Sequence, residues 1–153
     1  MSETRWLTAP QQRDWRAFVD GSVRLLDVLD QSLKTTHGLS MAEYEILVRL
    51  SEAPDRKLRM AQLAAEASQS RSRLSHTCAR LESKGLVRRE TCPSDKRGVL
   101  AYLTDEGFAT LERASHDHVT SVRDYFVDVV DATDLEAIGR AFNAIIRRVD
   151  SSR

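Results

Sequence analysis

Basic and hydroxyl side chains of the kind that hold nucleic acids gather between Arg56 and Arg97. This segment contains eleven Lys and Arg against four Asp and Glu, a local net charge of +7 in a 153-residue chain whose formal charge is zero. The rest of the chain therefore carries −7. A basic segment joined to an acidic remainder can bind phosphates while the whole chain stays soluble. The alternative is a solvated helix surface that carries Arg and Lys without a nucleic-acid partner.

A helix from Ser70 to about Lys84 would present most of these groups. Leu74, Cys78 and Leu81 fall on one narrow stripe at about 100° per residue, so this side should pack on other helices. Ser70 has the side chain of an N-cap residue and is also a candidate DNA-binding residue. The opposite side and its flanks carry small, polar and basic residues, namely Arg71, Ser72, Arg73, Ser75, His76, Ala79 and Arg80. Such a surface is typical of a helix that enters a DNA major groove.

The elements on either side of this helix complete a winged helix-turn-helix. A short helix over residues 60–67 and a polar turn precede it, and residues 86–90 and 99–103 read as paired strands after it. Turn residues over 92–98 join the strands into a basic loop that can reach the DNA backbone. The candidate DNA-binding residues of this wing are Arg88, Asp95, Lys96 and Arg97.

Longer helices flank this module. Residues 11–36 predict one amphipathic helix, a capping box at Ser40 and Glu43 starts a second, and Thr104 caps another that runs to about residue 130. The last helix carries apolar residues spaced by three and four: Leu135, Ile138, Phe142, Ile145 and Val149. One copy would leave these stripes exposed, whereas two copies would bury them. We therefore predict helical dimerisation regions at 11–36 and 105–150 around a DNA-binding region at 40–104, in one continuous domain.

From Trp15 to Val149 the chain resembles the multiple antibiotic resistance regulator (MarR) family. The resemblance rests on the segments LSMAEYEILVRLSEAP, RMAQLAAEASQSRSRLSHTCARLESKGLVRRE and SDKRGVLAYLTDEG. It implies a mainly α fold with a small β-wing, in which N- and C-terminal dimerisation helices flank the winged helix-turn-helix. It also implies a homodimeric cytoplasmic transcription regulator, usually a repressor, that binds a pseudo-palindromic double-stranded operator. A small phenolic or anionic ligand often releases such regulators from DNA.

The resemblance also implies roles for individual residues. Arg97 would enter the minor groove from the wing tip, and Asp95 would steady a neighbouring arginine. The matching recognition helix carries Ser72, Arg73, Ser75, His76 and Arg80.

The family's ligand cleft lies between the dimer helices and the DNA-reading unit, which makes Trp15, Arg24 and His37 candidates for an effector site. Trp15 offers a ring face, and Arg24 or His37 could meet a carboxylate. The alternative is that Trp15 packs in the dimer core, Arg24 is solvated, and His37 is only a cation at the end of a helix dipole.

The cysteines and histidines favour neither a metal site nor a redox site, and we expect no cofactor. Cys78 is predicted to be a small buried hydrophobe and Cys92 to be exposed in the wing. A redox role for Cys92 would require a pKa lowered by the neighbouring Arg88, Arg89 or Lys96. His116 and His118 diverge by about 200° on a helix, so we expect two solvated side chains rather than metal ligands.

The sequence lacks the motifs that would indicate other classes of function. There is no nucleophile elbow, phosphate-binding glycine loop or zinc-ligand spacing, so an enzyme is not expected. No apolar run approaches the roughly 20 residues of a membrane span, and no signal-peptide pattern opens the chain, which favours a cytoplasmic protein. The alternatives are a winged-helix adaptor that binds proteins without DNA and a metal-sensing regulator.

Overall fold

The protein is mainly helical with one small sheet. The computed structural model describes residues 3–152, and over these residues it contains six α-helices and a three-stranded antiparallel sheet. The elements are α1 (Ala9–His37), α2 (Met41–Glu52), β1 (Lys57–Arg59), α3 (Met60–Glu66), α4 (Arg71–Ser83), β2 (Val87–Cys92), β3 (Asp95–Leu103), α5 (Asp105–Val122) and α6 (Ala132–Asp150), with a 3-10 turn at Pro54–Arg56 and a π-helical turn at Arg123–Val127. This confirms the predicted mainly α fold with a small β-wing.

The chain divides into two compact units. The winged unit runs from Leu26 to His118, and the helical unit combines the residues up to Leu25 with those from Val119 onward. Among the described residues, no helix is both long and apolar enough to cross a membrane.

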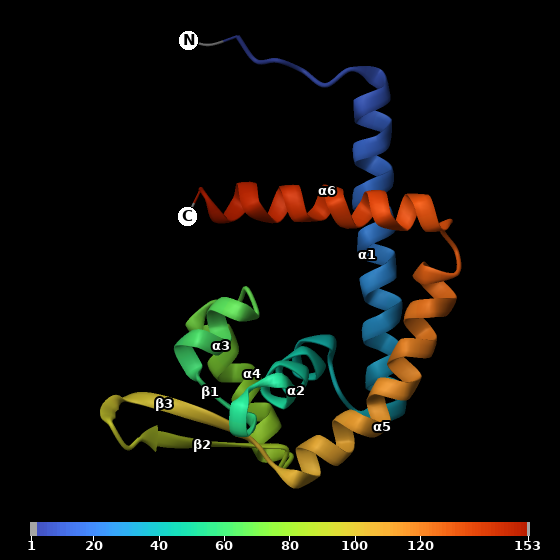
Figure 1. Cartoon of the computed structure of the whole chain (residues 1–153). Helices are drawn as coiled ribbons and strands as arrows, with labels where there is room; N and C mark the ends of the chain where they lie inside the picture. Colours follow the sequence, from blue (N-terminus) through green and yellow to red (C-terminus); the bar gives the residue numbers. More distant parts are fainter. Residues whose placement is uncertain (1–2, 153) are drawn as a thin grey trace. The chain divides into compact units, whose positions relative to one another are not determined.

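The winged unit is built on a core shared by its helices and sheet. Buried leucines from α2, α3 and α4, among them Leu47, Leu63 and Leu74, pack with Val87 and Leu103 of the sheet. The strand order is β1-β3-β2, so β3 pairs on both edges. Figure 1 shows the β2–β3 hairpin extending away from the cluster of α2, α3 and α4. The helices therefore hold the base of the hairpin.

Local chemistry fixes the helix ends where the sequence predicts them. The Glu43 backbone N–H donates to Ser40 Oγ at 3.1 Å, and the Ser40 N–H donates to Glu43 Oε2 at 2.9 Å, which completes the predicted capping box. Ser70 Oγ accepts from the Arg73 N–H at 3.1 Å. Gly38 and Gly85 have φ of 65° and 73°, the left-handed conformation that ends α1 and α4.

The wing differs from its prediction in strand length. β2 continues to Cys92 and β3 starts at Asp95, so only two residues form the turn rather than the seven expected. The pairing steps from Thr91 opposite Val99 to Cys92 opposite Asp95, which leaves residues 96–98 as a bulge in β3. β1 was not predicted at all, because three residues are too few for an alternating pattern and its partner β3 is distant in sequence.

The helices after the wing also differ from their predicted bounds. α5 ends at Val122 and passes into a π-helical turn rather than continuing to about residue 130. Asp131 Oδ1 accepts from the Asp134 N–H at 2.9 Å, so α6 is capped and begins at Ala132.

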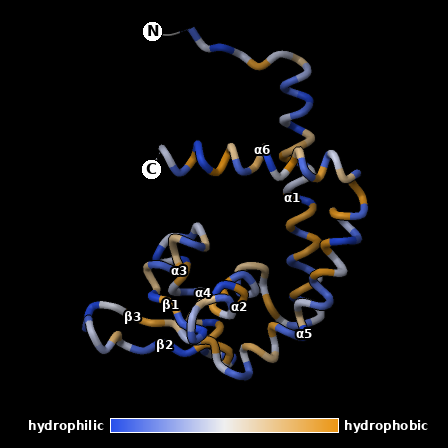
Figure 2. Tube along the Cα trace, in the orientation of Figure 1, coloured by the Kyte–Doolittle hydropathy of each residue, from blue (hydrophilic) through white to orange (hydrophobic). Residues whose placement is uncertain are grey.

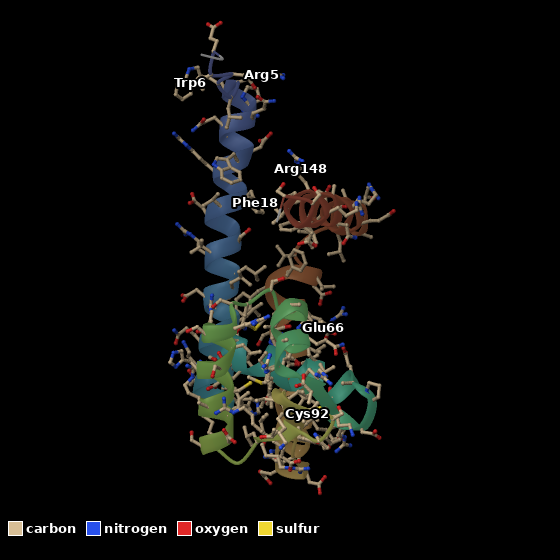
Figure 3. All side chains as sticks on the ribbon, turned by 90° about the vertical axis from the view of Figure 1, so that its left-hand side faces the viewer. Arg5, Trp6, Phe18, Glu66, Cys92 and Arg148 are labelled. Carbon is tan, nitrogen blue, oxygen red and sulfur yellow. The ribbon has the colours of Figure 1, made fainter. Side chains whose placement is uncertain are left out.

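The helical unit carries much uncovered apolar surface. Phe18 of α1 packs against Phe142 of α6 with ring centroids 5.4 Å apart, and Figure 3 shows Phe18 on the side of α1 that faces α6. No residue of α6 is buried. Hydrophobic and hydrophilic residues alternate along α1 and α6 in Figure 2. The exposed large apolar residues of the unit are Trp6, Leu7, Trp15, Phe18, Val23, Val119, Tyr125, Val129, Phe142, Ile145, Ile146 and Val149.

The start of α5 meets the end of α4 at a close backbone approach. Thr104 Oγ1 donates to the Gly85 carbonyl at 2.7 Å and accepts from the Gly107 N–H at 2.9 Å, and the Thr104 N–H donates to the Leu86 carbonyl at 3.1 Å. A Cβ at position 107 would lie 2.1 Å from the Leu86 carbonyl oxygen. Only glycine fits without moving backbone.

Gly107→Ala should therefore destabilise the protein by about 1–3 kcal/mol, the usual cost of forcing atoms into a packed contact. Urea unfolding measures this. Gly21→Ala is the control, since a Cβ there meets nothing within 4 Å and alanine favours a helix. Equal stability of Gly107→Ala and the wild-type chain would show that α5 and the end of α4 can separate without cost.

Candidate nucleic-acid interface

α4 presents one packed side and one open side. Leu74, Thr77, Cys78 and Leu81 are buried in the core. Thr77 was not predicted among them, but its hydroxyl donates to the Arg73 carbonyl at 3.1 Å and so needs no other partner. The exposed residues are Arg71, Ser72, Arg73, Ser75, His76, Ala79 and Arg80. The predicted division of the helix into packing and open sides is confirmed.

The bulge in β3 forms the outer part of the wing. Lys96 and Arg97 are exposed there. Asp95 Oδ1 accepts from the Arg97 backbone N–H at 3.0 Å, and Asp95 Oδ2 lies 3.5 Å from Arg59 Nη1. A Cβ at Gly98 would lie 3.1 Å from the same Arg59 nitrogen, so the bulge fits closely over β1. Asp95 thus holds the backbone of Arg97 and ties the wing to β1.

A cleft of about 410 Å³ separates the beginning of α4 from the wing. Its charged lining is Arg59, Arg71, Arg89, Asp95 and Arg97. Four guanidinium groups against one carboxylate give the concave surface a positive potential, which concentrates anions. The N-terminus of α4, where Ser70 and Arg71 lie, adds the positive end of a helix dipole. This arrangement suits a phosphate backbone.

Two of the predicted DNA-binding arginines already have acidic partners within the chain. Arg80 Nε lies 3.2 Å from Oε1 of the buried Glu43. Arg88 Nε lies 2.8 Å from Glu90 Oε1, and the guanidinium carbon is 4.4 Å from the centroid of the Tyr102 ring. Both side chains remain exposed. Sequence spacing could not give the Arg80 pair, because Glu43 is 37 residues away.

Arg89 is a residue of the interface that sequence reasoning did not select. It donates to Glu82 Oε2 through Nη2 at 2.8 Å and to Ser75 Oγ through Nη1 at 3.4 Å. It therefore joins β2 to the exposed side of α4. The alternation of β2 could have marked Arg89 as facing opposite to Arg88, but its partners on α4 come only from the fold.

The residues predicted for an effector site lie in different units. Trp15 and Arg24 belong to the helical unit; Trp15 is 54% exposed and its ring centroid is 5.6 Å from that of Phe18. His37 belongs to the winged unit, where its Nε2 lies 2.7 Å from Asp117 Oδ2. His37 thus has a carboxylate partner on α5, beyond the expected interaction with its own helix end.

The two cysteines differ in their surroundings. Burial raises the pKa of the Cys78 thiol to about 11, as expected of an inert core residue. Cys92 was predicted to be exposed, and this is wrong: the residue is only 6% exposed, at the last position of β2. A hydrogen bond with Ser94, with a smaller contribution from the Arg59 charge, lowers the pKa of Cys92. The neighbours predicted to do so, Arg88, Arg89 and Lys96, are not the cause.

His118 was predicted to be solvated, which is also wrong. Its ring packs on Tyr44 with centroids 4.5 Å apart, and burial lowers its pKa. His116 is exposed, as expected. Over residues 3–152, no three His, Cys, Asp or Glu side chains gather where they could hold a metal ion.

Comparison with known proteins agrees with this architecture. Residues 37–98 match the model of the MarR family. The fold superposes with a TM-score of 0.92 on Sco3205, a MarR family transcriptional regulator from Streptomyces coelicolor solved in complex with DNA. The two are 44% identical over 95% of this chain and 91% of that one. This chain belongs to the MarR family.

Two further relatives fit the assignment. AbsC, another MarR family regulator from Streptomyces coelicolor, is 41% identical over 97% of this chain and 99% of its own, with a TM-score of 0.91. The transcriptional regulator PecS of Dickeya dadantii (strain 3937) is 34% identical over 107 residues, 65% of this chain but only 61% of PecS. All three relatives are transcriptional regulators, the class expected from the sequence.

The thiols provide a test of this geometry in solution. A thiol reagent at pH 8 should modify Cys92 first, because a hydrogen bond with Ser94 lowers the pKa of its thiol, whereas burial raises the pKa of Cys78, which should react only after unfolding. Mass spectrometry of the labelled protein measures the order. The Cys92→Ser variant should lose the fast reaction and Cys78→Ser should keep it; the reverse order would contradict the packing of α4.

Proposed function

We propose that this MarR family member is a homodimer that binds DNA sequence-specifically and represses transcription. The observation that carries the proposal is the open polar side of α4 beside the cleft between α4 and the wing. The DNA complex of Sco3205, 44% identical to this chain, supports it. The region over 40–104 provides the DNA contacts, and the helices within 11–36 and 105–150 provide the dimer contacts.

Each part of the interface takes a different contact. Ser72, Arg73, Ser75 and His76 face base edges in the major groove. Ser70 and Arg71 meet phosphate at the N-terminus of α4, and Arg88 and Lys96 meet phosphate from the wing. Arg97 reaches the minor groove beside the recognition helix, with its backbone held by Asp95.

Arg97→Ala should weaken binding of the selected operator by about 1–3 kcal/mol with little change in folding. The operator is first selected from a random duplex pool with the wild-type protein, and fluorescence anisotropy then gives the affinity. Arg113→Ala, which removes an exposed arginine from α5 of the same unit, is the control and should change nothing. If Arg97→Ala binds the operator with wild-type affinity at near-physiological salt, the wing does not take part in DNA binding.

His76→Ala tests base reading rather than phosphate contact. It should weaken operator binding more than binding of a random duplex of equal length, because base contacts specify and phosphate contacts do not. An equal loss of affinity for both duplexes would show that His76 contacts only the DNA backbone.

The exposed apolar residues of the helical unit support the homodimer. Deleting the chain from Thr133 onward removes the apolar stripe of α6 and should abolish dimer and operator binding together, since one half-site supplies too few contacts. Ile145→Glu should act in the same direction, whereas Asn143→Glu, which places the same charge on the polar side of α6, should not. Sedimentation and anisotropy measure both properties. A monomer with wild-type operator affinity would contradict the proposal.

We also propose that an aromatic acid releases the repressor, with Trp15 as the ring contact and Arg24, in the same unit, as the cation. A ligand can act only through unequal affinity for DNA-competent and incompetent arrangements of the two recognition helices. Salicylate should therefore lower operator affinity, and operator should lower salicylate affinity to the same degree. Operator affinity that stays constant up to millimolar salicylate would exclude this ligand class. If operator affinity still responds to salicylate in both the Trp15→Ala and the Arg24→Ala variants, aromatic acids remain the ligand class but their binding site lies elsewhere.

A further inference from the structure

Glu43 is a buried carboxylate at the junction of α2 and α4. Glu43 is only 2% exposed, and among the described residues the buried polar and charged ones are Glu43 and Thr77. Three donors converge on it: the Ser40 backbone N–H on Oε2 at 2.9 Å, Arg80 Nε on Oε1 at 3.2 Å, and Lys84 Nζ on Oε2 at 2.8 Å. A helix cap needs only the first of these donors. The two cations therefore require another explanation.

Both cations come from the C-terminal end of α4: Arg80 is in its last turn, and Lys84 is the residue that follows the helix. Arg80 and Lys84 are four residues apart and so lie on one side of the helix. Lys84 Nζ also donates to the Gly38 carbonyl at 2.8 Å, which ties the end of α4 to the turn between α1 and α2. Burial by itself would raise the pKa of Glu43, but the hydrogen bonds from Lys84 and the Ser40 N–H, the Lys84 charge and Arg80 hold it below its usual value. Glu43 is thus an anion that fixes both cations.

Arg80 differs from Lys84 in the hydrogen-bond donors that remain available for DNA. Its Nε bonds Glu43 and its Nη2 lies 3.4 Å from Thr77 Oγ1, so these bonds engage one edge of the guanidinium. The side chain is nevertheless 54% exposed, on the open side of α4. The opposite edge of the planar group can therefore meet DNA while the first edge stays bonded to Glu43.

We propose that Glu43 is a positioning residue for DNA recognition, acting through Arg80 without touching DNA itself. An unrestrained arginine loses its rotamer freedom when it binds, whereas one already held by a buried carboxylate has lost that freedom on folding. The inference rests on the proposed function, because it assigns a supporting residue to the same interface.

The Glu43→Gln variant separates this role from helix capping. Glutamine at the third position of a capping box can still accept from the Ser40 N–H, so the cap persists, while the charge that holds Arg80 is lost. Anisotropy titrations with the selected operator and a random duplex are run on the wild type, Glu43→Gln, Arg80→Ala and the double variant. Urea unfolding and sedimentation confirm that each variant is a folded dimer.

Glu43→Gln should lower operator affinity about tenfold, within the range of couplings seen inside one charge network, and should lower random-duplex affinity less. In the Arg80→Ala background the same change should have no further effect on operator affinity. Lys84→Ala is the matched control: it removes the other cation of Glu43 and should cost stability while leaving the ratio of operator to random affinity unchanged.

Two results would overturn the inference. One is wild-type operator affinity in Glu43→Gln, and the other is an equal loss with and without Arg80, which would make Glu43 a structural residue only. If Glu43→Gln does not fold, the Arg80→Lys variant tests the inference instead. Lysine keeps the positive charge but lacks the two-nitrogen edge of the guanidinium, so Arg80→Lys should bind the operator nearly as weakly as Arg80→Ala. Wild-type operator affinity of Arg80→Lys would refute the role. Absence of any DNA binding by the wild type at low salt would instead refute the proposed function.

Discussion

The burial of one side of α4 is the constraint on which the rest of the winged unit depends. Leu74, Cys78 and Leu81 lie in the core with leucines of α2 and α3. Burying a leucine contributes about 1.5–3 kcal/mol, so turning α4 over would lose several kcal/mol and bury arginine. The rotation of the helix is therefore set by packing. Its polar and basic residues face outward as a consequence, whether or not DNA is present.

Contacts at the C-terminal end of α4 fix the position of the helix as well as its rotation. Glu43 holds Arg80 and Lys84 from the side of α2, and Thr104 holds the backbone of residues 85–86 at the start of α5. The bulge that carries Arg97 is held in turn by Asp95 and by Arg59 of β1. Helix and wing are thus fixed against the same sheet and core. A rigid support of this kind is what a recognition surface needs in order to bind without large reorganisation.

The sequence predicts those features that depend on neighbours a few residues apart. The caps at Ser40 and Ser70, the glycine helix ends and the two sides of α4 follow from local hydrogen bonding and helical period. Features that depend on distant partners were missed: β1 exists only because it pairs with β3, His118 is half-buried because it packs on Tyr44, and Arg80 meets Glu43 only in the folded chain. The turn at the tip of the wing was predicted too long, because the turn residues over 92–98 do not reveal a bulge within β3.

The central claim, that the open side of α4 and the wing bind DNA, is tested most directly by the salt dependence of binding by the full chain. The logarithm of the affinity for the selected operator should fall linearly with the logarithm of salt concentration, with a slope of about −0.9 per neutralised phosphate. A double variant, Arg71→Ala with Lys96→Ala, should bind with a slope shallower by about two such units. Binding that is absent at low salt, as expected of a protein-interaction adaptor, or that keeps the wild-type slope in the double variant, would contradict the account.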